Sequence, residues 1–110
     1  MKYVCLVYMD ENRLPDVPDR ECKAFGDTLR ESGRWLAGQA LQSIDTATTV
    51  RVRNGKTSVT DGPFAETKEQ LAGFYMIDAT DLNEAIQIAS RIPPARVGSI
   101  EVRPARELSV

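Results

Sequence analysis

The densest group of chemically active side chains lies between residues 61 and 68, around the tetrapeptide Asp61-Gly62-Pro63-Phe64. Glycine permits unusual backbone angles, and proline fixes the direction of the chain. Asp61 is therefore the candidate for an acid or base that projects into a cleft. The alternative is an Asx-turn, in which its carboxylate accepts hydrogen bonds from nearby backbone N–H groups.

Four further residues are candidates for contacts with a ligand. Phe64 follows the rigid Gly-Pro step, and it either walls a pocket or anchors the loop. Glu66 and Lys68 are loop charges that orient a polar or anionic ligand, or are simply solvated. Tyr75 carries a polar tip on an apolar body. Its hydroxyl donates to a ligand, or makes a structural hydrogen bond or a contact between subunits.

The chain contains no histidine, and this absence excludes several kinds of chemistry. Neither a Ser-His nor a Cys-His catalytic pair can form, and the commonest metal ligand is missing. Cys5 and Cys22 are too few for a structural zinc site, which needs four cysteine or histidine ligands. No glycine-rich phosphate loop is present. We therefore expect neither a metal ion nor a cofactor.

The composition indicates one globular domain, residues 1–110, with 42% hydrophobic and 27% charged residues. The net charge of −2 and the absence of a basic patch argue against direct binding of nucleic acid. No apolar run approaches the roughly 18–20 residues of a membrane span. Met1 leads straight into a strand pattern without a signal peptide. We expect a cytoplasmic protein whose thiols are free.

Hydrophobic periodicity predicts the order β-α-β, a hairpin, then β-α-β. The hairpin is marked by Asn54-Gly55, because both positions tolerate positive φ. Two β-α-β halves indicate a ferredoxin-like α+β fold, with an antiparallel sheet, two helices on one face and an inserted hairpin. The predicted strands cover residues 2–9, 34–41, 48–53, 56–60, 70–79 and 99–103, and the predicted helices residues 18–33 and 81–92.

The positions of the side chains follow from the same periodicity. In the strand at 70–79 one face is predicted to carry Leu71, Gly73, Tyr75 and Ile77, and the other Ala72, Phe74 and Met76. The buried stripe of the second helix is predicted to consist of Leu82, Ala85, Ile86, Ala89 and Ile92. Gly38 is expected to mark a bulge or a close approach of the backbone, and Gly73 to leave room for a neighbour or a ligand.

The strands at 2–9 and 70–79 are apolar on both faces. Two helices cover only one face of such a sheet, which leaves the other face apolar and exposed. Large apolar patches are rare on soluble monomers, so we expect a homodimer that pairs the two sheets. The alternative is that loops, or the hairpin folding back, cover this face.

The segment from Val59 to Ile86, VTDGPFAETKEQLAGFYMIDATDLNEAI, resembles the signature of the YCII-related family in its DGPF branch. The N-terminal KYVCLVYMDE, the hairpin TATTVRVRNGKTSVTDG, RIPPAR and EVRPARE are similar to that family as well. The resemblance implies a dimeric α+β barrel. It also implies a functional link to extracytoplasmic-function sigma factors. The histidine and aspartate pair from which activity is suspected in other members has no counterpart here, because histidine is absent.

Three functions follow as hypotheses. The first is a module that binds a small molecule or regulates another process, with Asp61, Glu66 and Tyr75 at the mouth of its site. The second is a cofactor-free enzyme, similar to an isomerase or an oxygenase, that uses Asp61 as an acid or base. The third is a purely structural dimer that interacts with other proteins.

Overall fold

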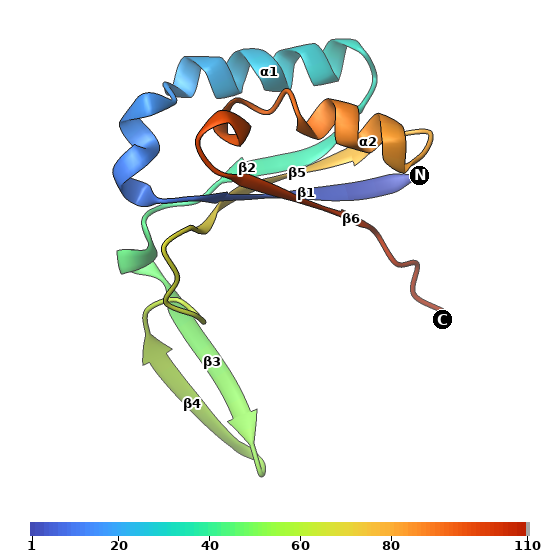
Figure 1. Ribbon diagram of the computed structural model, residues 1–110. Coiled ribbons are helices and arrows are strands. Elements are labelled where there is room, and N and C mark those ends of the chain that lie inside the picture. Colours follow the sequence, from blue (N-terminus) through green and yellow to red (C-terminus); the bar gives the residue numbers. More distant parts are fainter. Residues whose placement is uncertain (110) are drawn as a thin grey trace.

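The computed structural model describes residues 1–109, which form a four-stranded sheet, two helices and a separate hairpin (Figure 1). The sheet has the order β2-β5-β1-β6, and every neighbouring pair is antiparallel. The elements are β1 (Lys2–Met9), α1 (Asp19–Glu31), β2 (Trp35–Ala40), β3 (Thr48–Arg53), β4 (Lys56–Asp61), β5 (Gln70–Asp78), α2 (Leu82–Ala89) and β6 (Ser99–Pro104). The predicted α+β, ferredoxin-like arrangement is confirmed, with both helices on one face of the sheet.

The core lies between the sheet and the two helices. Alternate residues of β1 are buried there, which is the pattern of a strand with one face against helices. α1 contributes Leu29, and β5 contributes the fully buried Ile77. Pro18 precedes α1 as its N-cap, one position earlier than predicted, and the predicted loop before it contains a short 3-10 helix, Glu11–Asp16.

The buried stripe of α2 differs from the prediction. Leu82 and Ile86 are about half exposed, whereas Ile88, which the prediction omitted, is buried with Ala85 and Ala89. The helix is short, and its buried face is centred on small residues that let it lie close to the sheet. Leu82 and Ile86 are four residues apart, so they share a different, outward line along the helix.

A β-bulge changes the faces of β5. The register shifts between Val7 and Tyr8, so that Val7 opposes Gly73 while Tyr8 opposes Leu71. Leu71 therefore joins Tyr8 on the face away from the helices, and Ala72 packs against the core. The prediction had placed Leu71 on the face of Tyr75 and Ile77, and Ala72 on the other face, because strict alternation does not anticipate a bulge.

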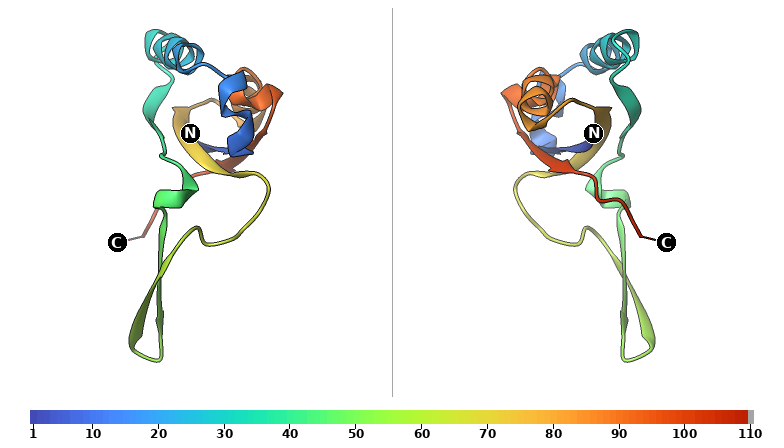
Figure 2. Two further views of the ribbon diagram at one scale, coloured as in Figure 1. Left: turned by 90° about the vertical axis from the view of Figure 1, so that its left-hand side faces the viewer. Right: turned by 90° about the vertical axis from the view of Figure 1, so that its right-hand side faces the viewer.

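Strands β3 and β4 form their own two-stranded sheet, as predicted, with Asn54 and Gly55 in positive φ at the turn. We call residues 48–61 the arm. The arm projects from one end of the domain on the side away from the helices, and it does not fold back over the sheet (Figures 1 and 2). Its residues Val50, Val52 and Val59 are exposed to about 60%.

The sheet face away from the helices is the open face. It carries Val4, Leu6 and Tyr8 of β1 beside Phe74 and Met76 of β5, and all five are partly exposed. In the part of the chain that the structure describes, both helices lie on the other side of the sheet. The predicted apolar surface is therefore present in the subunit. Among residues 1–109, no helix combines the length and the apolar character that a bilayer crossing requires.

Candidate functional site

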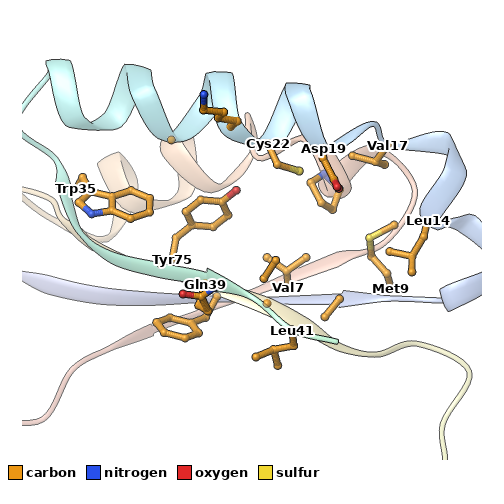
Figure 3. Close-up of a pocket in the computed structure, with 18 of the residues that line it drawn as sticks. Val7, Met9, Leu14, Val17, Asp19, Cys22, Trp35, Gln39, Leu41 and Tyr75 are labelled. Carbon is orange, nitrogen blue, oxygen red and sulfur yellow. The ribbon is translucent and has the colours of Figure 1, made fainter. Parts of the chain in front are cut away.

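A cavity of about 680 Å³ lies between α1 and the sheet, and we call it the first cavity (Figure 3). Its floor comes from β1, β2 and β5, and its roof from α1 and the segment before it. Most of the lining is apolar, which is typical of small-molecule sites of this size. The lining includes Val7, Met9, Leu14, Val17, Cys22, Gly26, Trp35, Gly38, Ala72, Gly73, Phe74, Tyr75 and Pro94.

Aromatic contacts fix the position of Tyr75 in this cavity. Its ring meets Phe25 edge to face, with centroids 5.5 Å apart, and meets Trp35 in the same way at 6.0 Å. The guanidinium of Arg30 lies 4.0 Å from the centre of the Trp35 ring. Such contacts favour one orientation of each ring. The phenol of Tyr75 is therefore preorganised beneath α1.

Two glycines at the floor leave room for neighbouring groups, a side chain of the same strand at Gly38 and the backbone of β2 at Gly73. A Cβ atom on Gly38 would lie 2.5 Å from the Trp35 ring, and one on Gly73 would lie 2.9 Å from the carbonyl oxygen of Gln39. The predicted close approach at Gly38 is confirmed. At Gly73 the neighbour is backbone, and the residue also lines the cavity. The expected room for a neighbour at Gly73 is thus confirmed, and room for a ligand stays a prediction.

Two polar groups of the first cavity, the Tyr75 hydroxyl and the Cys22 thiol, influence one another, and the Gln39 side chain lines the cavity as well. Burial raises the pKa of Tyr75 to about 12, and a hydrogen bond with Cys22 adds to this effect. Burial also raises the pKa of Cys22, as do the carboxylates of Asp19 and Glu21, while the hydrogen bond from Tyr75 lowers it. Both groups are therefore neutral near pH 7, and they offer a hydrogen-bond donor and a polarisable sulfur rather than charge.

Charged side chains also line the first cavity. They are Asp19, Lys23 and Arg30 of α1. Arg30 also forms an ion pair with Asp27, at 3.0 Å between Nη1 and Oδ1. The lining thus combines an apolar majority with charges of both signs on α1.

A second cavity of about 580 Å³ lies at the base of the arm, beside the open face. None of the described residues that line it is charged. Tyr8 and Leu71 belong both to this cavity and to the open face. The second cavity is lined by Tyr8, Leu41, Gln42, Ser43, Ile44, Thr46, Ala47, Pro63, Phe64, Ala65, Thr67, Gln70 and Leu71.

The structure separates the predicted site residues. Tyr75 lines the first cavity, whereas Phe64 lines the second and is 80% exposed. Asp61 is the last residue of β4, where it is exposed opposite Thr48. Glu66 and Lys68 are exposed in the loop that follows, and neither they nor Asp61 line either cavity.

Backbone and side-chain contacts hold the turn after Asp61. Gly62 has a φ of 111°, a conformation that favours glycine. Its N–H donates to the carbonyl of Ala47 at 2.8 Å, and its own carbonyl accepts from the Thr49 hydroxyl at 2.9 Å. Further along, the amide of Gln70 donates to the carbonyls of Ala65 and Thr67.

Two residues of the first cavity were not among the predicted site residues. Cys22 and Trp35 are side chains of the kind that usually belong to the core. Both thiols are free, as expected, with Cys5 buried and Cys22 partly so. The available signal was Gly38, which lies opposite Tyr75 in the sheet and leaves room for the ring of Trp35.

The sheet order, with two helices on one face and a cavity beneath one of them, defines a ferredoxin-like α+β domain with an internal site. The profile of the YCII-related domain matches residues 1–109. The chain is also similar to an uncharacterised protein, R00369, of Rhizobium meliloti (strain 1021). The two are 39% identical over 113 residues, which cover 94% of this chain and 91% of that protein. The chain belongs to the YCII-related family.

Proposed function

We propose that this protein is a homodimeric module that binds a small, uncharged aromatic molecule in the first cavity. The observation that carries the proposal is a mostly apolar cavity in which two aromatic contacts hold the neutral Tyr75 hydroxyl near the neutral Cys22 thiol. A flat ligand would stack beside Trp35 and accept a hydrogen bond from Tyr75. The link to sigma factors that the DGPF resemblance implies would make such a ligand an input to transcription.

The chain supplies its own reporter for binding, because Trp35 is the only tryptophan and it lines the first cavity. Uncharged nitroaromatics such as 4-nitroanisole and 4-nitrobenzyl alcohol quench indole fluorescence, so they serve as probes. We expect saturable quenching of Trp35 and a rise in the melting temperature with probe concentration. Quenching that stays linear in probe concentration would show only collisions and would contradict the proposal.

Two variants locate the binding site. Gly26→Leu adds volume from α1 into the first cavity and should abolish saturable quenching. Tyr75→Phe removes one hydrogen bond and keeps the ring, so affinity for 4-nitrobenzyl alcohol should fall roughly 2- to 12-fold. The matched control is Tyr8→Phe, the same change on the open face, which should leave the affinity unchanged. Equal binding by the wild type and Gly26→Leu would place the probe elsewhere.

The dimer is the second part of the proposal, and the open face supports it. Five large apolar side chains occupy the two central strands of that face, β1 and β5. Burial of such surface stabilises association by about 25 cal/mol per Å². Sheets with one apolar face commonly bury it against another sheet, at a separation of about 10 Å.

Sedimentation equilibrium at micromolar concentration tests the dimer. The wild type should have twice the subunit mass of 12.2 kDa. Leu6→Asp places a charge in the middle of the open face and should give a folded monomer. Ile86→Asp is the control, because Ile86 is half exposed on the outside of α2. A wild-type monomer, or equal effects of the two substitutions, would contradict the dimer but not ligand binding.

A further inference from the structure

The open face alone is small for a stable interface between two subunits. Four strands spaced about 4.8 Å apart and about 20 Å long have a projected area of about 380 Å². A standard interface removes about 800 Å² of accessible surface from each partner. If the proposed dimer forms, its interface must extend beyond the sheet onto adjoining uncharged surface.

Charge shows the direction in which the interface can extend. At the β6 edge the open face carries Glu101 and Arg103, which form an ion pair with each other. At the end of the sheet beside the arm, Tyr8 and Leu71 continue directly into the uncharged second cavity. Interface centres are depleted of charged residues and enriched in aromatic ones. The second cavity therefore has the composition of an interface centre.

Four of the six polar side chains that line the second cavity, all except Tyr8 and Gln42, are already engaged within the subunit. The Ser43 hydroxyl donates to Glu11, and the Thr46 hydroxyl donates to the carbonyl of Ser43. Thr67 donates to the carbonyl of Glu69, and the Gln70 amide donates to two loop carbonyls. A polar ligand would find few free donors on this wall. The cavity thus favours an apolar occupant.

Phe64 is the most exposed large apolar side chain of this cavity. The residue is 80% exposed, and the guanidinium of Arg51 lies 5.6 Å from the centre of its ring. A large exposed aromatic residue at the rim of an uncharged hollow is typical of an interaction hot spot.

We propose that the second cavity, with Phe64 at its rim, is a second part of the dimer interface, next to the open face, and is closed by apolar side chains of a second copy of this chain. The site is incomplete in one subunit, because the partner supplies the missing wall. This inference rests on the proposed dimer and adds to it a second contact area that the sheet-to-sheet pairing does not require.

The test measures the dimer dissociation constant of single variants by sedimentation. Phe64→Ala should weaken the dimer roughly 30-fold, as for an aromatic hot spot. The exposed ring contributes little to the fold of the subunit, so circular dichroism and thermal unfolding of the diluted monomer should not change. Leu82→Ala is the control, because it removes a half-exposed apolar side chain on α2. An unchanged dissociation constant for Phe64→Ala overturns the inference.

A second measurement follows the burial of position 64 itself, at protein concentrations that span the dimer dissociation constant. Phe64→Cys in a Cys22→Ser background should react with maleimide more slowly as the protein concentration rises and the partner covers the site. Leu82→Cys in the same background should react at a rate independent of concentration. If Leu6→Asp gives monomers while both Phe64 variants behave like their controls, this inference falls and the sheet-face dimer stands. A monomeric wild type would contradict both the sheet-face dimer and this inference.

Discussion

The hydroxyl of Tyr75 in β5 points toward the thiol of Cys22 in α1 across the first cavity, and each group shifts the pKa of the other (Figure 3). The two groups respond in opposite ways, because the contact lowers the pKa of Cys22 and raises that of Tyr75. This pair lies between the roof of the cavity and its floor. A change in one of the two groups should therefore be measurable as a change in the pKa of the other.

Tyr75→Phe should therefore raise the pKa of Cys22 further. Burial and the neighbouring carboxylates remain, whereas the contact with Tyr75, which favours the thiolate, is lost and only the attraction of Arg96 still lowers the pKa. The rate of Cys22 alkylation by iodoacetamide, followed from pH 7 to pH 10, should shift to higher pH. Tyr8→Phe is the control and should leave the profile in place. A shift to lower pH would mean that the hydroxyl does not stabilise the thiolate.

Stability should decrease in alkaline solution. Burial raises the pKa of Cys5 from 9.0 to about 11, so the unfolded chain loses this proton more readily than the folded one. The contribution of Cys5 is fully present below pH 9 and is lost as the pH rises to 11. The contribution of Tyr75 to stability is lost in the same way between pH 10 and about 12.

Urea unfolding at pH 8, 9, 10 and 10.5 measures this effect. The free energy of unfolding of the wild type should fall with each step above pH 9. Cys5→Ala will be less stable at every pH, because it removes buried volume, but its dependence on pH should be flatter. Parallel pH curves for the two proteins would contradict the assignment to Cys5.

Two glycine-to-alanine substitutions should change stability in opposite directions. Gly73→Ala places a Cβ 2.9 Å from the Gln39 carbonyl oxygen, which is backbone and yields poorly, so the loss should be about 1–3 kcal/mol. Gly26→Ala in α1 meets only ordinary contacts at 3.5 Å and should stabilise by about 0.4–1 kcal/mol. Chemical denaturation of both variants beside the wild type checks the signs.

Asp61→Asn should leave probe binding in the first cavity unchanged. Asp61 is exposed at the end of β4 and lies outside the lining of both cavities. The titration of Trp35 fluorescence that tests the proposed function measures this directly, with Tyr75→Phe as the positive control. A loss of affinity for Asp61→Asn comparable to that of Tyr75→Phe would restore Asp61 as a site residue.

The sequence predicted the architecture because each strand and helix has a strong local signal. The Asn54-Gly55 turn, the alternation in β3 and the apolar run of β5 each determine their own element. The bulge at Tyr8 has no such signal, and it reverses the faces of Leu71 and Ala72. The centre of the buried stripe in α2 depends on how closely the helix approaches the sheet, which is a property of packing.

The candidate site was harder to predict, because its residues are distant in sequence. Most of the predicted site residues form one compact group in the sequence, namely Asp61, Phe64, Glu66 and Lys68. The arm carries Asp61 away from the sheet, and only the folded chain brings Cys22, Trp35 and Tyr75 around one space. An aromatic residue opposite a strand glycine was the one local sign of that space.

The chain enters and leaves the arm at almost the same point, where the Gly62 N–H meets the Ala47 carbonyl at 2.8 Å. An insertion or deletion within the arm, beyond this hydrogen bond, lengthens or shortens the arm without moving the strands of the main sheet. Relatives can therefore differ in the reach of this projection while the interior beneath α1 keeps its dimensions. Substitutions in the arm and substitutions in the lining of the first cavity can therefore accumulate independently.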